Sequence, residues 1–318
     1  MKEKHLKNNT SGFKTSIGGQ ALMEGILMRG PEKQAIVCRG KDGLIEKCEE
    51  LKYTREKYKI LGVPFVRGCF VFISSLINGM NALTYSAELL PEEEQGEPDA
   101  IDRWIEKHFS EEKAKKVIIG TAVVLGIALS LFLFVFLPVT LVGFAVKEPL
   151  WLKNLLEGLV KIIILLAYMF LCSKQSDIKR VFSYHGAEHK SIFCYEHRKP
   201  LTVENVREES RFHPRCGTSF LLVVVLVSVI VNSVVTAKAT LARIGWHLLL
   251  LPVVVGISYE INRWCGLHDN ALSAALSAPG KWLQRMTTNE PDDSMIECAI
   301  RALELVIPEK EGADSWGA

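Results

Sequence analysis

A run of thirty residues without a charged side chain, Val117 to Val146, constrains the fold of this chain more than any other feature. A helix needs about 20 mostly apolar residues to cross the hydrocarbon core of a bilayer, so this run is long enough for one transmembrane helix. The excess length predicts a tilted helix or a break at Pro138, because proline lacks a backbone N–H and its ring disturbs the preceding turn.

Three further segments have the apolar character of membrane spans: 154–172, 219–236 and 241–262. Any one of them could be buried in a soluble core instead, but four such runs, joined in pairs by short connections, favour the membrane. The chain is therefore predicted to be a predominantly α-helical multi-pass membrane protein with about four transmembrane helices. The segment 154–172 contains the charged residues Glu157 and Lys161, and the segment 241–262 contains Arg243, His247 and Glu260.

The distribution of positive charge predicts the orientation of the spans. Nine Lys or Arg residues lie between Lys174 and Thr218, whereas the connections 147–153 and 237–240 contain three lysines in total. Loops rich in Lys and Arg stay on the cytoplasmic side of a membrane. The predicted location is the cytoplasmic membrane, with the long loop and both termini in the cytosol.

A small β-rich cytosolic region is predicted over 16–60. Two β-type runs, 34–39 and 44–48, flank Lys41-Asp42-Gly43, a sequence typical of a hairpin turn. The next segment, 61–90, repeats apolar residues at helical spacing with polar residues between them, which predicts an amphipathic helix on the membrane or packed against the spans. If this helix crossed the bilayer instead, fourteen Lys and Arg of residues 1–67 would lie outside the cell.

The remaining segments complete the predicted organisation. The sequence after Asp292 predicts a short helix whose apolar face packs on the cytosolic region. The full order is a disordered N-terminus (1–15), the β-rich region (16–60), the amphipathic helix (61–90), an acidic linker and short helix (91–116), transmembrane helices 1 and 2 (117–172), a cytosolic histidine-rich loop (173–218), transmembrane helices 3 and 4 (219–262) and cytosolic C-terminal helices (263–318).

The motif His185-Gly-Ala-Glu188-His189 carries the clearest chemical signal. Two histidines four residues apart, with a glutamate three after the first, lie on one side of a helix and can offer two imidazoles and a carboxylate to one metal ion. The order His-x-x-Glu-His is the inverted form of a zinc-protease signature. A five-residue pattern also arises by chance, and surface histidines are the alternative interpretation.

Three further candidate ligands lie at the same predicted membrane face. His213 and Cys216 directly precede the third span, and Glu260 lies at the inner end of the fourth. The histidine and the cysteine could equally be a loop residue and a buried thiol, and the glutamate could pair with a neighbouring arginine. Arg215, between the first two, is a candidate for orienting an anionic substrate group.

Three motifs in order resemble those of the bacterial YqhQ-type family. They are Gly18-Gly19-Gln20-Ala21-Leu22-Met23-Glu24-Gly25-Ile26-Leu27-Met28-Arg29-Gly30-Pro31, His185-Gly186-Ala187-Glu188-His189-Lys190 and His213-Pro214-Arg215-Cys216-Gly217-Thr218-Ser219, and the resemblance extends over about residues 16 to 305. That family is described as predicted metal-dependent multi-pass membrane proteins of unknown function. The resemblance implies a bacterial inner-membrane location and a metal, and it implies no substrate.

Two functions compete. The first is a hydrolase in which His185 and His189 bind Zn²⁺ or another divalent metal, with Glu260, His213 or Cys216 as third ligand and Glu188 as general base, acting on a membrane peptide or lipid. The second is a non-catalytic assembly or scaffold protein, in which the same residues form a structural metal site or a metal-free polar cluster.

Composition excludes other classes of function. The net charge of +2, without a basic stripe, does not indicate a nucleic-acid partner. The eight cysteines form no Cys-x-x-Cys pair, which indicates a reducing environment without a disulfide framework.

Overall fold

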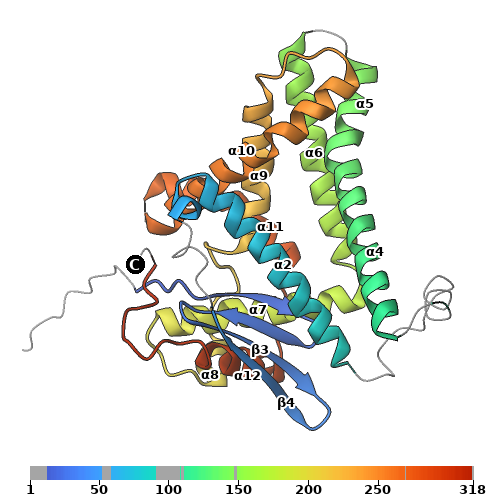
Figure 1. Ribbon diagram of the computed structural model, residues 1–318. Coiled ribbons are helices and arrows are strands. Elements are labelled where there is room, and N and C mark those ends of the chain that lie inside the picture. The colour runs from blue at the N-terminus through green and yellow to red at the C-terminus, as the bar shows by residue number, and fades with distance from the viewer. Residues whose placement is uncertain are drawn as a thin grey trace, which may run out of the picture.

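The computed structural model describes residues 13–51, 59–90, 108, 111–146, 149–268 and 270–316. The chain is mostly helical, with one small antiparallel sheet near its N-terminus. Long apolar helices form an elongated bundle, and the sheet lies at one end of it together with α7 (Ser176–Glu196), α8 (Val203–Arg207) and α12 (Asp293–Glu304) (Figure 1). The predicted class, a largely helical chain with a small N-terminal sheet, is confirmed.

The sheet has four strands in the order β1-β2-β3-β4: Gly18–Leu22, Gly25–Arg29, Lys33–Gly40 and Gly43–Glu50. Each strand pairs with the next in antiparallel register, so β1 and β4 are the edges. The predicted hairpin is present, because Gly40 pairs with Gly43 across a two-residue turn. Gly43 adopts φ 137°, a conformation that glycine allows and L side chains rarely adopt.

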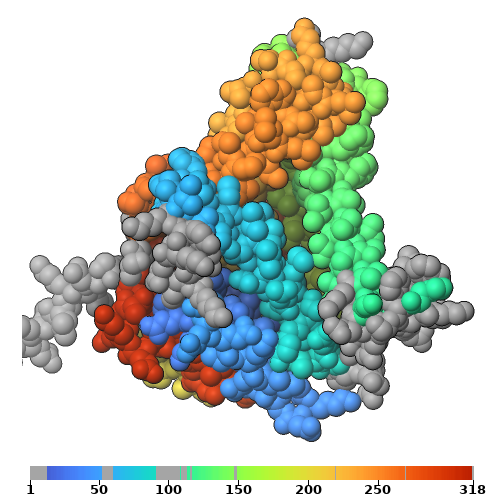
Figure 2. Space-filling view, in the orientation of Figure 1, coloured from blue at the N-terminus to red at the C-terminus, as the bar shows by residue number. Residues whose placement is uncertain are grey.

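The two faces of the sheet are covered by different helices, because side chains alternate between the faces along each strand. One face packs on α7 and α12 and forms the larger apolar core. The opposite face packs on the C-terminal half of α2 (Val66–Glu88), where Ala82 joins a second, smaller core. Helix α2 therefore lies between the sheet and the helical bundle (Figures 1 and 2).

Helix α12 forms where the sequence predicts a short amphipathic helix. Asp292 caps it by accepting a hydrogen bond from the backbone N–H of Met295 at 2.9 Å. The residues predicted to share its apolar face are all buried: Met295, Ile296, Ala299, Ile300 and Leu303.

The bundle consists of α4 (Glu111–Leu131), α5 (Leu137–Ala145), α6 (Leu150–Cys172), α9 (Gly217–Asn232) and α10 (Thr240–Leu267). Between α4 and α5 the chain forms a single π-helical turn, Phe132–Phe136, which ends just before Pro138. A proline ring clashes with the carbonyl four residues earlier in a regular helix, and a wider turn relieves that clash. The break predicted at Pro138 is therefore a local widening of a helix that continues past the proline.

In the part of the chain that the structure describes, four helices are long and apolar enough to cross a membrane: Val66–Glu88, Val117–Ala145, Leu150–Cys172 and Thr240–Leu267. The sequence also predicted four spanning helices, but they are not the same four. The expected third span is α9, which has only 16 residues and is about 24 Å long at 1.5 Å per residue. Its place among the four is taken by α2, which the sequence predicted to lie at the interface.

Two other predicted segments also differ from what the structure shows. The cytosolic segment predicted at 173–218 contains the helices α7 and α8, whose apolar residues complete the core under the sheet. The start of the chain is ordered earlier than predicted, since Thr15 is buried and its hydroxyl donates to Asp314 at 2.6 Å. Residues 1–12 and most of the predicted linker, 91–107, lie outside the described residues.

Ionisable side chains are buried between α6 and α10. Arg243 donates two hydrogen bonds to Glu157, at 3.0 and 2.8 Å, and a third to Asn154 at 2.5 Å. One turn further along both helices, Lys161 Nζ lies 3.2 Å from His247 Nδ1. These five residues are called the α6–α10 polar cluster below, and all are less than 9% exposed.

Candidate metal centre

Helix α7 brings His185, Glu188 and His189 to one side, as their spacing predicted. The two imidazole rings are 4.4 Å apart between centroids. The helix can approach its neighbours closely because residue 186 is glycine, and a Cβ there would collide with the carbonyl of Asn289. The motif therefore lies in a crowded interior, which excludes its interpretation as a pair of surface histidines.

Each of the two histidines is oriented by a backbone carbonyl. His185 Nδ1 lies 2.8 Å from the carbonyl of Thr287, and His189 Nδ1 lies 2.5 Å from the carbonyl of Arg211. A carbonyl accepts only, so each Nδ1 carries a proton, and Nε2 is the ring nitrogen left to bind a metal. Metal-binding histidines are typically held in this way through their second nitrogen.

Cys216 completes a group of three converging donor atoms. It is the N-cap of α9, and its sulfur accepts from the N–H of Thr218 at 3.4 Å and lies 3.2 Å from His185 Nε2. One ligand atom each from His185, His189 and Cys216 lies within 4.8 Å of the others. His189 Nε2 is fully buried and has no hydrogen-bond partner among the residues that the structure describes. A buried lone pair without a partner is costly, and a metal ion at this point would satisfy it.

Glu188 lies beside these donors. One carboxylate oxygen accepts from the backbone N–H of Gly19 at 2.9 Å, and the other lies 3.8 and 3.9 Å from the Nε2 atoms of His185 and His189. Burial raises the pKa of the Glu188 carboxyl above its ordinary value, against the opposing effect of the two imidazoles. A carboxyl with a raised pKa is suited to accepting and returning a proton near neutral pH.

The electrostatics of the cluster favour a thiolate at Cys216. Burial alone would raise the pKa of the thiol, but the imidazoles of His189 and His185 outweigh burial and hold it well below its ordinary value. In the same way, burial opposes protonation of His185, but the sulfur of Cys216 and the carboxylate of Glu188 raise its pKa to about 9. A metal bound here therefore displaces the proton from His185 Nε2, after which the thiolate and the two imidazoles form a good zinc donor set.

His213 lies next to the cluster without joining the three donors. Its ring centroid is 5.6 Å from that of His189, and its Nε2 lies 3.6 Å from a carboxylate oxygen of Glu196. Burial lowers the pKa of His213 to about 4, despite that carboxylate, so the imidazole is neutral at pH 7. Arg215 forms a buried ion pair with the same Glu196 and stacks on Trp316. The arginine considered for substrate orientation is therefore already paired.

The structure does not bring Glu260 to the cluster. It lies in α10, where it accepts hydrogen bonds from the guanidinium of Arg67 and from the backbone N–H of Phe65. Glu260 therefore fixes the start of α2 against α10.

Two contributors to the site were not identified from the sequence. The side chain of Gln284, in α11 (Ala271–Thr287), accepts from the N–H of His213 at 2.8 Å and donates to its carbonyl at 2.7 Å, and so fixes the segment leading to Cys216. A lone glutamine on a helix gives no such signal. Glu196 likewise neutralises Arg215 from the end of α7, outside the motif.

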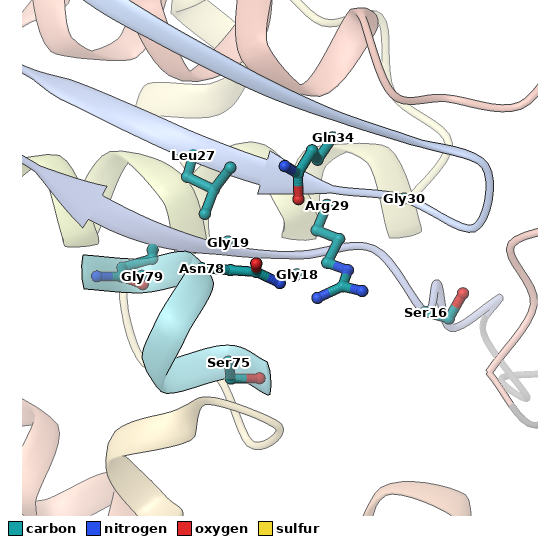
Figure 3. A pocket seen from close by; sticks show the side chains of 11 residues that line it. Ser16, Gly18, Gly19, Leu27, Arg29, Gly30, Gln34, Ser75, Asn78 and Gly79 are labelled. Atoms are coloured by element: carbon teal, nitrogen blue, oxygen red, sulfur yellow. The ribbon is translucent and has the colours of Figure 1, made fainter. Parts of the chain in front are cut away.

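A cavity of about 100 Å³ opens at the donors and is lined by Glu188, His189, His213 and Cys216, among others. A second cavity of about 310 Å³ lies on the other face of the sheet, between β1, β2 and α2, and is called the polar groove below. Both cavities are lined by Ser16, Gly18 and Gly19. In the polar groove, side chains from the sheet and from α2 approach from two sides, as Figure 3 shows for Arg29, Gln34, Ser75 and Asn78.

Comparison with known proteins places the chain in a family. The sequence profile of the family described as "Protein of unknown function (DUF1385)" matches residues 63–309. The chain is also 36% identical, over 293 residues, to a Bacillus subtilis (strain 168) protein named "Uncharacterized protein YqhQ", and the alignment covers 90% of each chain. The chain belongs to the DUF1385 family. Membership in the YqhQ-type family, which the three motifs predicted, is thereby confirmed, and the family match spans the second and third of them. No solved structure matches the chain.

Proposed function

We propose that the chain is a metal-dependent hydrolase of the bacterial cytoplasmic membrane, with its metal centre on the cytosolic side. The observation that supports this most directly is the convergence of His185 Nε2, His189 Nε2 and Cys216 Sγ, with the orphaned lone pair of His189 among them. Two imidazoles and one thiolate match the ligand preferences of Zn²⁺.

The number of protein donors supports a catalytic rather than a structural site. Structural zinc sites have four protein ligands, and catalytic sites have three with one position open. Among the described residues the donor group contains three, and the remaining candidates, His213 and Glu260, are engaged with Glu196 and Arg67. The scaffold alternative requires a fourth protein ligand from elsewhere.

The residues around the donors have the roles that hydrolysis needs. A bound Zn²⁺ supplies Lewis acidity, which polarises a scissile carbonyl and lowers the pKa of water. Glu188 accepts the proton of the attacking water on the oxygen that faces the histidines and returns it to the leaving group. Its other oxygen is held by the N–H of Gly19, so the carboxylate is positioned before substrate arrives.

The polar groove favours a peptide over a lipid as substrate. The cavity at the donors has room for a few waters only, so most of a substrate must lie outside it. The groove shares Gly18 and Gly19 with that cavity and is lined by the amide side chains of Gln20, Gln34 and Asn78. Side-chain amides donate and accept hydrogen bonds, as a peptide backbone requires.

The proposal is tested with the full chain in neutral detergent, freed of metal and then reloaded with Zn²⁺. The probe is β-casein, an unstructured polypeptide, and cleavage is followed by mass spectrometry. We expect cleavage by the zinc-loaded wild type and none by the metal-free protein or by the His185→Ala, His189→Ala double variant. Cleavage that is equal with and without zinc would contradict a metal-dependent hydrolase.

The contact of 3.2 Å between His185 Nε2 and Cys216 Sγ favours a second candidate, a thiol-dependent hydrolase. Cys216 lies at the N-terminus of α9, where the helix dipole stabilises a thiolate, and His185 would act as its base. Such an enzyme stays active after chelation of the metal and is inactivated by iodoacetamide in the metal-free state. The same experiment therefore separates the two candidates.

A further inference from the structure

The sheet has two edges, and they differ in how they are protected against pairing with another strand. The edge strand β4 has the sequence GLIEKCEE, which contains the charged residues Glu46, Lys47, Glu49 and Glu50. Charged side chains on an edge strand discourage a further strand from adding to it. The opposite edge strand, β1, has the sequence GGQAL, without a charged residue or a proline. The edge of β1 is therefore the one that is open to the addition of a strand.

The register of β1 shows which backbone groups point to this open edge. In an antiparallel pair, residues that exchange hydrogen bonds with the neighbouring strand alternate with residues whose N–H and C=O point away from it. Leu22 pairs with Gly25 across a two-residue turn and therefore bonds to β2. Ala21 and Gly19 then point outward. The N–H of Gly19 agrees with this alternation, because it donates to the carboxylate of Glu188, outside the sheet, at 2.9 Å.

Ala21 has an unused backbone donor and acceptor at this edge. Its side chain packs on the larger core of the sheet, so its backbone is the part that faces outward. No other segment that the structure describes hydrogen-bonds to its N–H or C=O. The start of the strand is also accessible, since Gly18 and Gly19 are exposed. An extended polypeptide fits such an edge, because its own N–H and C=O groups recur with the spacing of a strand.

The open edge leads directly to the metal centre. The cavity at the donors and the polar groove are both lined by Gly18 and Gly19, which have no side chains to separate the two. Side chains of an added strand alternate between its two faces. Those on one face would enter the polar groove beside Asn78 (Figure 3), and those on the other would face Glu188 and the donors. Ala21 lies two residues from Gly19, about 7 Å along a strand, so a polypeptide bound at Ala21 reaches the centre.

We propose that the open edge of β1 binds the substrate of the metal centre as an extended polypeptide segment, which adds to the sheet as a fifth strand. This inference rests on the proposed hydrolase function, and it adds the conformation of the substrate and the backbone groups that hold it. The backbone of a helix is already hydrogen-bonded within the helix. The site therefore selects unfolded segments, and a transmembrane helix must unwind before it is cleaved.

The test measures polypeptide binding directly, by fluorescence anisotropy, so that it does not depend on cleavage. The protein is the full chain in neutral detergent, carrying Glu188→Gln so that the probe is not consumed. The probe is fluorescein-labelled α-lactalbumin that has been reduced and carboxymethylated to unfold it. Ala21→Pro removes the outward N–H without removing a bond to β2, and it should weaken binding about tenfold, the effect of one backbone hydrogen bond.

Two matched variants serve as controls. Ala21→Ser changes the side chain but keeps the N–H, and it should bind as the Glu188→Gln parent does. Cys48→Pro removes an outward N–H from the other edge, β4, and it should also bind as the parent does. Unchanged affinity in Ala21→Pro, or an equal loss in Cys48→Pro, would overturn the proposal.

Hydrogen–deuterium exchange of the same parent protein keeps the test decisive if Ala21→Pro does not fold. Added α-lactalbumin should slow exchange in β1 and leave exchange in β4 unchanged. Protection of β4 instead of β1 would overturn the proposal. Protection of β1 together with a doubled mass before any polypeptide is added would assign the edge to a second copy of the chain, and would also overturn it.

These measurements separate this inference from the proposed function. If zinc-loaded wild type and zinc-loaded Ala21→Pro cleaved β-casein with the same kcat/KM, pairing at β1 would be contradicted and the hydrolase would stand. If Ala21→Pro weakened binding but the wild type cleaved nothing with or without zinc, the edge would stand as a polypeptide-binding site and the hydrolase would be contradicted.

Discussion

At the scale of single residues, the metal ligands and the general base have separate roles in the proposed function. In that function, His185, His189 and Cys216 offer lone pairs to a metal, and Glu188 moves a proton. Replacing Glu188 by glutamine keeps the shape of the side chain but removes its ability to accept a proton. We expect the Glu188→Gln variant to retain the zinc content of wild type and to lose hydrolytic activity, measured on the same preparation by metal analysis and by peptide cleavage. Loss of zinc in this variant would make Glu188 a ligand instead.

A comparison of Cys216→Ser with Glu260→Ala separates the candidate third ligands. Cys216 lies within the donor group and Glu260 pairs with Arg67, so a competition titration with a zinc-binding dye should show a large loss of affinity in the first variant only. The loss should exceed the 10–100-fold that is typical when a residue behind the ligands is removed. Wild-type affinity in Cys216→Ser combined with a collapse in Glu260→Ala would contradict the ligand set.

The glycine pair of the N-terminal motif gives a matched test of close approach. A Cβ on Gly19 would lie 2.8 Å from the carbonyl oxygen of Leu27 and 2.9 Å from Cγ of Glu188, whereas a Cβ on Gly18 would meet nothing within 4 Å. Gly19→Ala should therefore destabilise the fold by about 1–3 kcal/mol, the usual cost of overpacking. Gly18→Ala should leave stability within about 1 kcal/mol of wild type. Thermal unfolding of the two variants in one detergent checks this prediction. An equal change in stability in the two variants would show that a Cβ at position 19 fits without a clash.

Much of the site was predictable at this scale because helical spacing is a local property. The positions of His185, Glu188 and His189 on one face follow from 3.6 residues per turn. The convergence of Cys216 could be expected only as one of three alternatives, because it depends on how α9 packs beside α7. The roles of Gln284 and Glu196 depend on contacts between segments far apart in the sequence, and nothing in their local sequence indicates them.

At the scale of secondary-structure elements, the α6–α10 polar cluster is the feature whose stability effect can be tested most directly. Removing one partner of a buried ion pair leaves the other charge uncompensated, which costs about 3–5 kcal/mol. Arg243→Met should therefore lower the midpoint of thermal unfolding in detergent strongly. The double variant Arg243→Met, Glu157→Met should recover most of that loss, because neither charge is then left buried alone.

The control for this comparison is Leu249→Met, an exposed position in the same helix. It changes a side chain without touching the cluster and should unfold as wild type does. If the Arg243→Met single variant unfolded at the same temperature as this control, the cluster would contribute nothing to the packing of α6 against α10.

The elements also show where an apolar run and the helix that it forms differ in length. The apolar run 219–236 predicted a full span, but α9 ends at Asn232, and the residues from 233 to 239 connect it to α10. Hydropathy counts apolar residues and does not report where the helix stops. Conversely, α2 combines an apolar composition with polar residues such as Ser75 and Asn78, so its pattern fits both an interfacial and a spanning helix.

At the scale of the whole molecule, the charge asymmetry of the loops predicts an orientation in the membrane. We predict that Leu150→Cys, at the start of α6, reacts with a membrane-impermeant maleimide from outside the cell only. The native Cys48, exposed on β4, serves as the internal control and should react from the cytosolic side only. Labelling of position 150 exclusively from the cytosolic side would reverse the predicted topology.

The same scale explains why the fold could be predicted in outline only. Long uncharged runs such as 117–146 and the hairpin signal around Asp42 reveal the existence of elements, because each depends on a single stretch of chain. The placement of α7 under the sheet requires burial of apolar residues from β2, β3, α7 and α12 in one core. Such long-range packing is set by the combined surface of several elements, and no local pattern encodes it.

The central claim is that this chain holds a metal ion through His185 and His189. The most direct measurement is the metal content of the purified full-length protein, determined by inductively coupled plasma mass spectrometry beside the His185→Ala, His189→Ala double variant. We predict about one zinc ion per wild-type chain, consistent with a single three-donor site, and none in the double variant, with both proteins folded by circular dichroism. Equal metal content in the two proteins, or no metal in the wild type after purification and zinc dialysis, would contradict the account.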